Sequence, residues 1–502
     1  MFWTLSLTTW ILLHGHSLFL PLLLLPRSPL LTVFEAEHLI DSLKQFTLAE
    51  VGCPRWMKQH ENMERLNIQA HWNTAQMREE FVAVQLVDGE KMETVVYDLL
   101  LIDRWKKRIW PQIDVRKINS ENVLRVYFMH YHEATVLNLL EIVLYNEPSV
   151  TALGDSVVDL IDYCARKLVA LATWPTTSDP TDIDSSASTA DAPTALLSNP
   201  AQTLRTHLSV LSLLRHIASN LSALPFSVMT RLLVKHDIVV GLARVLEQKP
   251  WERRVRSGKR WVWERLTEAA EWKVVDEAER EGVVSWAAQA WLTLYTLMLD
   301  PECRKHYEFT TQNHATLLKL RPHLTPSLLD QIPPLADLLR HLEQLSLYEP
   351  PTAPSSRPLA GFVEELPVLE MRILDGVDLD ALAQTVAKQL TLAEKNAADM
   401  TKGLADTYTH PTLTTLLPTP AACANPACPN RETHPVAAHR CSACRSEWYC
   451  GRACQVACWK SHKRACEMMR AAAEGDANAN TMLKTGKSEV LASAAEGRIQ
   501  EL

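Results

Sequence analysis

The sequence predicts an all-α protein, a HEAT- or armadillo-like stack of helices followed by a small metal-binding module near the C-terminus. Three observations support this prediction. Only 14 of the 502 residues are glycine, which disfavours turn-rich all-β folds and glycine-rich nucleotide folds. Apolar residues make up 47% of the chain and recur at helical spacing in one segment after another. Eight of the 11 cysteines lie between Cys423 and Cys466.

Size and charge narrow the class further. A chain of 502 residues exceeds what one hydrophobic core usually includes, so we favour a stack of helices over a non-repeat helical bundle. The net charge of −8 is unsuited to coating nucleic acid or an anionic membrane, and neither is expected as a partner. One tight cysteine cluster in a long chain indicates metal ligands in a reducing compartment rather than disulfides.

Residues 1–32 form an apolar N-terminal extension. No Lys or Arg precedes the apolar run, and His14, Gly15, His16 and Pro21 interrupt it. A signal peptide, a membrane anchor and a mis-called start codon are the three alternatives. Because the cysteine cluster needs free thiolates, secretion is disfavoured, and we expect the working protein to lack residues 1 to about 30.

Residues 33–347 are predicted to form a helical domain. The apolar residues of 34–46 fall on one stripe, and 134–145 is apolar over most of its circumference, which is typical of a buried helix. Further helices are expected over 157–171, 203–218, 227–246 and 283–299.

Composition divides the rest of the chain. A stretch rich in Ser, Thr, Asp and Pro is predicted to be a disordered insert at 173–202. The remaining parts are a linker at 348–365, a helical segment at 366–410, a Thr/Pro spacer at 411–420, a finger at 421–466 and a flexible tail at 467–502.

The cysteine cluster has the spacing of zinc ligands. Its four pairs are Cys423-x4-Cys428, Cys441-x2-Cys444, Cys450-x3-Cys454 and His462-x3-Cys466. Zinc prefers four sulfur or nitrogen ligands in a tetrahedron, so eight ligands predict two ions, with no open position for catalysis. Ligands four residues apart can share one helical face. The alternative is a purely structural role, in which zinc only stabilises the fold. Every structural zinc site has this role in part.

The segments from Cys441 to Gln455 and from Trp459 to Cys466 resemble the MYND zinc finger. The resemblance implies that the pairs interleave: Cys423, Cys428, Cys450 and Cys454 bind one zinc ion, and Cys441, Cys444, His462 and Cys466 bind the other. It also implies that short proline-containing peptides bind through Gln455 and Trp459. The alternative for Trp459 is packing in the core of the finger. Cys458 fits neither zinc site and is interpreted as a bystander thiol that binds no metal.

Several blocks outside the finger resemble the axonemal dynein-arm assembly factor family of MYND proteins, also called BLU. These blocks are 59–70, 132–141, 159–168, 250–254 and 317–331, and the resemblance runs from about residue 33 to Cys466. It implies a non-enzymatic cytoplasmic scaffold or co-chaperone that stabilises dynein heavy chains and is needed for cilium or flagellum motility. The implied partners are a leucine-rich-repeat assembly factor, chaperones and the dynein chains. The implied location is cytoplasmic, near the basal body or centriolar satellites.

The sequence also leaves other functional classes to compare with an assembly factor. A transcriptional corepressor or other nuclear adaptor is the main alternative, whereas a methyltransferase would need a SET domain split around the finger. The basic, Trp-containing stretch 253–263 is expected to be a solvated loop, with a phosphate- or RNA-binding patch as the alternative.

No enzyme is predicted. The pair His132–Glu133 lacks the second histidine of a His-Glu-x-x-His site because Val136 stands there, and no phosphate loop or nucleophile elbow is found. We expect His60, Glu61 and His132 to be satisfied polar groups at helix ends.

Overall fold

The computed structural model describes residues 31–75, 78–119, 122–178, 199–257, 260–349 and 366–392, and in the finger 423, 425, 428, 439–441 and 448–473. The chain forms two compact units, Met1–Thr412 and Leu413–Leu502. Residues 1–30, the insert at 179–198, most of the predicted linker, the segment 393–410, the 411–420 spacer and the tail beyond 473 lie outside the described residues.

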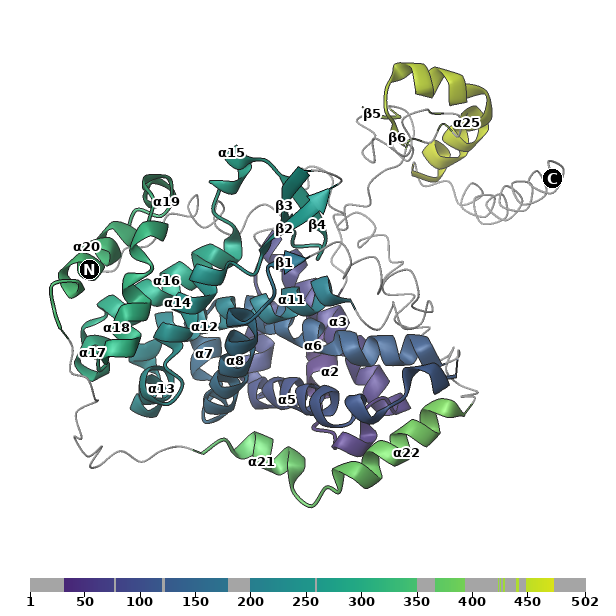
Figure 1. Cartoon of the computed structure of the whole chain (residues 1–502). Coiled ribbons are helices and arrows are strands. Elements are labelled where there is room, and N and C mark those ends of the chain that lie inside the picture. The colour runs from purple at the N-terminus through teal and green to yellow at the C-terminus, as the bar shows by residue number, and fades with distance from the viewer. Residues whose placement is uncertain are drawn as a thin grey trace. The chain divides into compact units, whose positions relative to one another are not determined.

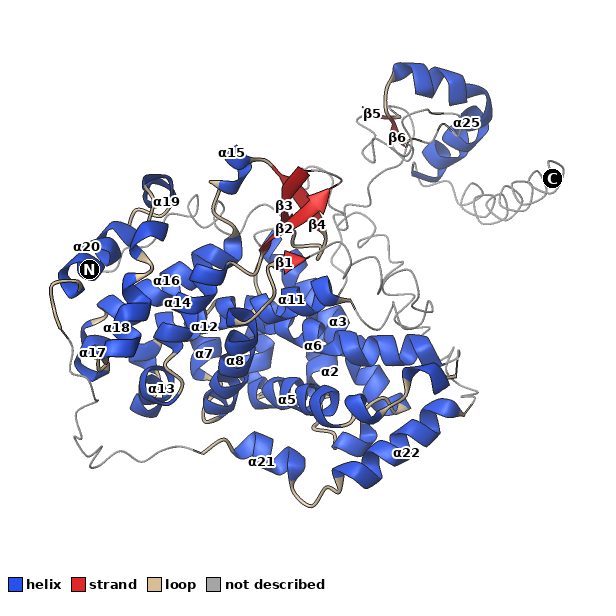
Figure 2. Cartoon of the chain, in the orientation of Figure 1, coloured by secondary structure: helices blue, strands red, loops and turns tan. Residues whose placement is uncertain are grey.

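The first unit is a stack of helices (Figures 1 and 2). Its N-terminal half contains η1 (Leu48–Glu50), η2 (Trp110–Gln112), η3 (Val115–Lys117), α2 (Val33–Asp41), α3 (Pro54–Ala75), α4 (Phe81–Asp88), α5 (Met92–Arg108), α6 (Val123–Val143), α7 (Glu147–Thr151) and α8 (Ser156–Ala172). Helix α6 packs against α3 on one side and α5 on the other. The run Leu99–Leu100–Leu101–Ile102 of α5 is wholly buried. Because neighbouring elements cover every face of the helix there, each of these positions is apolar.

The second half continues the stack. It contains α11 (Pro200–Leu208), α12 (Val210–Ser219), η5 (Leu221–Ala223), α13 (Phe226–Thr230), η6 (Arg231–Lys235), α14 (Ile238–Gln248), α15 (Glu277–Arg280), α16 (Ser285–Leu299), α17 (Pro301–His306), α18 (Thr311–Leu318), η7 (Arg321–His323), α19 (Pro326–Gln331) and α20 (Leu335–Leu345). Helix α8 packs on α14, α12 on α16, and α16 on α20. Because each helix buries its apolar stripe against its neighbours, the predicted helical stack is confirmed.

The packed body begins at Leu31 and Thr32. The side chain of Leu31 is fully buried, and its N–H donates to Gln69 Oε1 at 2.8 Å. Thr32 caps α2 in a reciprocal capping box with Glu35. Both residues therefore belong to the helical body rather than to an extension that precedes it.

The predicted helix at 227–246 is interrupted. Residues Arg231–Lys235 widen into a π-helical turn, and Asp237 adopts a left-handed conformation with φ of 42°. The Asp237 side chain accepts hydrogen bonds from the N–H of Val240 and the hydroxyl of Tyr307. This capping carboxylate, rather than the apolar period, decides where α14 starts.

The basic stretch at 253–263 is not a loop, and that prediction was wrong. Strands β2 (Glu252–Ser257), β3 (Arg260–Leu266) and β4 (Trp272–Val275) form an antiparallel meander, and β1 (Thr177–Ser178) joins β2 in parallel. Figure 2 shows this sheet in red. Arg254 lies opposite Trp263 on the neighbouring strand, and its guanidinium is 6.0 Å from the Trp263 ring centroid. Arg and Trp side chains on neighbouring strands thus make cation–π contacts with one another.

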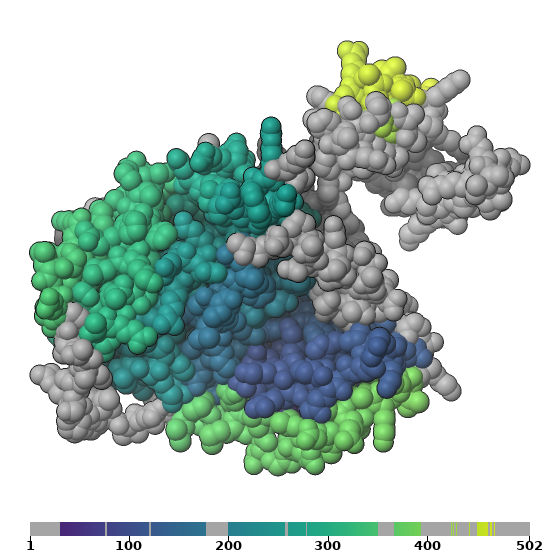
Figure 3. Space-filling view, in the orientation of Figure 1, coloured from purple at the N-terminus to yellow at the C-terminus, as the bar shows by residue number. Residues whose placement is uncertain are grey.

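The segment after residue 365 returns to the N-terminal half of the stack. Helix α21 (Val368–Leu374) packs against α5 and α8, and α22 (Leu379–Thr391) packs against η2. Asn122 Nδ2 donates to the carbonyl oxygens of Leu390 at 3.1 Å and Leu392 at 2.9 Å. In Figures 1 and 3 this segment, in green, lies along the blue N-terminal helices. Within the described residues, no helix combines the length and the apolar character needed to cross a membrane.

Candidate metal centre

The described elements of the finger are two short strands and one helix. Strands β5 (His439–Arg440) and β6 (Trp448–Tyr449) pair antiparallel, and α25 (Arg452–Ala473) follows. Cys441 comes directly after β5, and Cys450 directly after β6. The pairing of the two strands therefore fixes where both cysteines lie, and α25 carries the ligands that come later in the sequence.

The first group of predicted ligands is Cys423, Cys428, Cys450 and Cys454, whose sulfurs all lie within 4.8 Å of one another. The Sγ atom of Cys450 is 3.2 Å from that of Cys428, 3.3 Å from Cys454 and 3.6 Å from Cys423. Tetrahedral zinc, with Zn–S bonds of about 2.3 Å, would set such sulfurs about 3.8 Å apart. The four thiols thus fit one zinc ion after a small expansion.

The second group joins Cys441, His462 and Cys466, whose ligand atoms also lie within 4.8 Å of one another. All three residues are buried, and the sulfurs of Cys441 and Cys466 are 3.8 Å apart. The fourth predicted ligand, Cys444, lies outside the described residues. Along α25, Cys454 precedes His462 by eight residues, or about 12 Å of helix rise, so the two groups form separate sites.

The thiols of the first group are coupled by hydrogen bonds. Burial opposes ionisation of Cys423, but hydrogen bonds from the backbone of Cys450 and Asn425 and from neighbouring thiols lower its pKa to about 7. Contacts of the Cys450 thiol with the sulfurs of Cys428, Cys454 and Cys423 raise the pKa of Cys450. One thiolate is thus favoured by its neighbours, and a divalent cation is needed before all four ionise together.

Gln455 and Trp459 lie four residues apart on α25 and share one face of it. The Trp459 ring is 41% exposed, and it contacts the His462 ring edge-on with centroids 6.0 Å apart. Gln455 is half-buried. Trp459 is therefore not a core residue of the finger, and it presents an aromatic surface next to the second ligand group. Cys458 lies in neither group.

A buried polar network in the helical body was missed from the sequence. His60 and His132 do not lie at helix ends but in the middle of α3 and α6, with no exposed surface. His132 Nε2 is 3.0 Å from Asp98 Oδ2, and that oxygen also accepts from Gln59 Nε2 at 3.1 Å. Asp98 lies in the apolar run of α5. An acid in such a run was the only feature of the sequence that could have indicated this network.

Two helices of this network, α3 and α6, and the neighbouring α8 carry three of the blocks behind the family resemblance. Residues 59–70 lie in α3, 132–141 in α6 and 159–168 in α8. Most of their polar side chains point into the body. Thr135 donates to Glu64 at 2.6 Å, for example, and Tyr163 donates to Glu133 at 2.8 Å. These blocks are therefore parts of the polar core of the stack.

Comparison with known proteins identifies the class. Residues 423–466 match the family model of the MYND finger, so this segment is a MYND zinc finger, and its two ligand groups are its two zinc sites. Four thiols in one group and a thiol–imidazole set in the other are donors that suit zinc. The prediction of zinc as the cofactor is confirmed.

The similarity extends well beyond the finger. The chain is 28% identical over 454 residues to the zinc finger MYND domain-containing protein 10 homolog of Drosophila melanogaster, covering 85% of this chain and 96% of that protein. This confirms the resemblance to the BLU family, and it includes the helical body. No solved structure matches the chain significantly.

Proposed function

We propose that this protein is a non-enzymatic cytoplasmic scaffold for the preassembly of axonemal dynein arms, needed for motility of cilia or flagella. The supporting observation is similarity through both units to a MYND protein, together with the blocks that resemble the dynein-arm assembly family. A MYND-type protein-interaction role follows from the finger itself. That the protein acts on dynein chains is the part of the proposal that goes beyond this interaction role.

The finger would bind a partner peptide through Gln455 and Trp459. Trp459 leaves 41% of its surface in water, although tryptophan is favoured where a partner will cover it. A short proline-containing peptide suits such an aromatic surface, because its extended conformation costs little entropy to hold. We propose the leucine-rich-repeat assembly factor as the source of that peptide.

The physical logic of the scaffold is effective concentration. Very large multidomain chains such as dynein heavy chains populate aggregation-prone intermediates and depend on chaperones while they fold. A protein that holds client and chaperone together raises the rate of their encounter without new chemistry. The helical stack would offer an extended contact surface, and the finger would recruit one cofactor.

The first zinc group gives no reason to propose catalysis. Cys423, Cys428, Cys450 and Cys454 supply four thiols, which completes a tetrahedron and leaves no position for substrate. The ion would hold the start of α25 against the segment that carries Cys423 and Cys428. We therefore propose that zinc supports the peptide surface rather than acting on a substrate.

The test of the peptide surface is a pull-down of the assembly factor with the full-length protein. Trp459→Ala should weaken capture at least tenfold, because it removes a central aromatic contact. Ala457→Ser is the matched control, since Ala457 is exposed on α25 and lies about 160° around the helix from Trp459. Zinc content should not change in either variant. Undiminished capture by Trp459→Ala would place the partner elsewhere.

The test of the cellular role is loss of the protein in flagellated cells. We expect immotile flagella that lack dynein arms, with heavy-chain protein reduced and heavy-chain transcript unchanged. Reduced transcript would support the corepressor alternative. Normal motility would refute the assembly role.

A further inference from the structure

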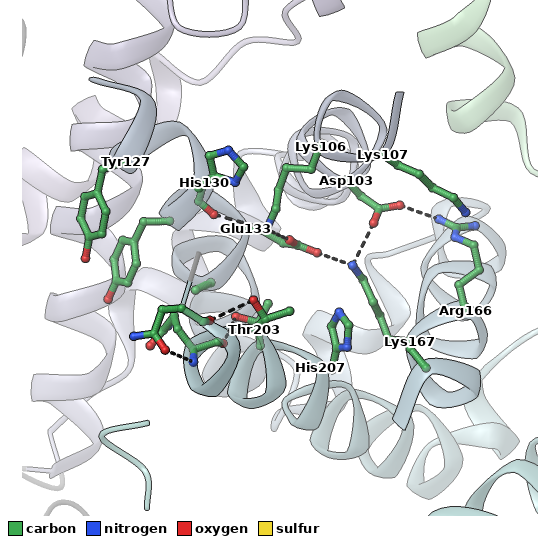
Figure 4. A pocket seen from close by; sticks show the side chains of 16 residues that line it. Asp103, Lys106, Lys107, Tyr127, His130, Glu133, Arg166, Lys167, Thr203 and His207 are labelled. Carbon is green, nitrogen blue, oxygen red and sulfur yellow. Dashed lines mark hydrogen bonds and ion pairs between the residues drawn. The ribbon is translucent and has the colours of Figure 1, made fainter. Parts of the chain in front are cut away.

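A polar cavity of about 530 Å³ lies in the helical body between α5, α6, α8 and α11 (Figure 4). Its volume is typical of small-molecule sites, but its walls carry charges where such sites are mostly apolar. Neither the finger nor the scaffold role accounts for it. The identity of the charged groups therefore decides what the cavity is suited to bind.

Cations outnumber carboxylates in the lining. Lys106, Lys107, Arg166 and Lys167 line the cavity, and Asp103 and Glu133 are the two acids among the lining residues. Both acids are already engaged. Glu133 pairs with Lys106 and Lys167, and Asp103 pairs with Lys167 at 2.9 Å and Arg166 at 3.1 Å. Arg166 also pairs with Glu370 at 3.1 Å, and Glu370 pairs in turn with Arg104. With these two neighbours counted, five cations face three carboxylates, so two positive charges remain in excess.

The ionisation of the paired groups supports this count. Burial opposes a charge on Glu133, but Lys106 and Lys167 hold its pKa well below the ordinary range. Burial likewise opposes a charge on Lys167, yet Glu133 and Asp103 raise its pKa. Glu133 is thus ionised and paired on both sides, and Asp103 already contacts Lys167 and Arg166, so both acids are engaged by cations other than Lys107.

Lys107 is the cation without an acid. Among the described residues no ion pair involves it, and its side chain is exposed at the last turn of α5. Burial, and then the positive charges of Arg104 and Arg166, lower the pKa of Lys107. Figure 4 shows Lys107 and Arg166 at one end of the cavity and Tyr127 at the other. An anion between Lys107 and Arg166 would relieve this repulsion.

The rest of the lining offers neutral hydrogen-bonding groups. The rings of Tyr127 and Tyr131 stack with centroids 6.0 Å apart and an interplanar angle of 10°. In the described structure, His130 Nε2 and His207 Nδ1 are buried without a hydrogen-bond partner. Burial lowers the pKa of His130 to about 3 and that of His207 to about 4, so both rings are neutral near pH 7. These groups suit the polar body of a ligand, not its anionic end.

The start of α11 is not the anion site. Asn199 caps this helix, and its Oδ1 accepts from the N–H groups of Ala201 at 3.1 Å and Gln202 at 3.2 Å. Those two amides are therefore not free to bind a ligand. The surplus charge at Lys107 and Arg166 is the feature that remains for an anion.

We propose that this cavity binds a phosphate monoester, with the phosphate at Lys107 and Arg166 and the organic part toward Tyr127 and Tyr131. Near neutral pH a phosphate monoester carries a charge of about −1.5 to −2, which matches the two surplus cations, whereas a carboxylate brings one charge. The Arg166 guanidinium already donates to Glu370 and Asp103 at 3.1 Å each, so it would attract the phosphate by its charge, while Lys107 supplies the free N–H donors. The phosphate could come from a free small molecule or from a phosphorylated side chain of a protein.

The test is calorimetric titration of the full-length, zinc-loaded protein with two pairs of probes. AMP is compared with adenosine, and a phosphoserine peptide with its unphosphorylated form. Binding by the phosphorylated member of either pair, and not by its counterpart, is the expected result. Stronger binding of AMP identifies a free small molecule as the source, and stronger binding of the peptide identifies a modified protein. Absence of binding by every phosphorylated probe at millimolar concentration would overturn the proposal.

Variants locate the site. Lys107→Ala should weaken binding of the successful probe roughly tenfold, and Lys107→Glu should abolish it, because charge-assisted hydrogen bonds contribute about this much. Arg108→Ala is the matched control, since Arg108 is the next residue of α5, is exposed and does not line the cavity. Thermal unfolding confirms that each variant is folded. Equal weakening in Lys107→Ala and Arg108→Ala would mean non-specific attraction and would also overturn the proposal.

Discussion

The imidazole rings of His60 and His132 meet nitrogen to nitrogen in the core, with 2.9 Å between their Nδ1 atoms. One of these nitrogens must donate and the other accept. Because the Asp98 carboxylate lies 3.0 Å from His132 Nε2, that nitrogen carries a proton and donates it to Asp98. The chain of hydrogen bonds therefore runs from α3 through α6 to α5.

Removing the central ring should be costly. His132→Ala leaves Asp98 and His60 without their shared partner in a site with no exposed surface, and it opens a cavity. We expect the free energy of unfolding to fall by roughly 2–4 kcal/mol, measured by urea denaturation followed by circular dichroism. His38→Ala, an exposed histidine of α2, should change it by less than about 0.5 kcal/mol. Equal stability of the two variants would contradict the role of the network.

Acid should destabilise the helical body. Burial lowers the pKa of His60 well below its ordinary value, that of His71 and His207 to about 4, and that of His130 to about 3. In the unfolded chain these rings bind protons below about pH 6.5, whereas the folded protein does not, so stability falls as pH drops through that value. Each ring contributes up to about 1.4 kcal/mol per pH unit.

Three acids oppose this trend. Burial raises the pKa of Asp159 to about 6, and it also raises the pKa of Glu141 and Asp237, so their protonation at low pH favours the folded state. The four histidines outweigh these acids between about pH 5 and pH 6.5. The melting temperature of the helical signal should therefore decline steadily across this window. A flat profile would show that the rings are protonated in the folded state.

The finger should hold two zinc ions per chain. Elemental analysis of the purified protein should find about two, and Cys450→Ser should remove the ion of the first group, because Cys450 lies at the centre of that group. Cys458→Ser is the control on the same helix and should leave the zinc content unchanged. Loss of both ions in Cys458→Ser would refute the assignment of ligands.

The segment that returns to the N-terminal half should depend on Asn122. Its amide bonds the carbonyl oxygens of Leu390 and Leu392 at the end of α22. Asn122→Ala should therefore increase hydrogen exchange in α22 by roughly tenfold, which corresponds to about 1.4 kcal/mol, while α16 keeps its protection. Exchange that rises equally in both helices would indicate global destabilisation instead.

The helical class and the zinc chemistry were readable from the sequence because both depend on local spacing. The apolar period that marks a helix repeats within a few residues, and each ligand pair lies within five positions. The antiparallel sheet was missed because arginines occupy three of the six positions of β2, and a run of charge usually indicates a solvated surface. Only the pairing of β2 with β3 in the folded protein places Trp263 opposite Arg254.

The sequence by itself determined that this is a helical protein with a two-zinc finger, and it pointed to the polar blocks of α3, α6 and α8. The tertiary structure alone decided what those blocks contact. His132 meets a carboxylate 34 residues away, and Asn122 meets carbonyl groups 268 and 270 residues away. The charged cavity likewise takes its lining from four helices. Such contacts depend on how whole helices pack, and packing buries residues by their position in space rather than by their spacing along the chain.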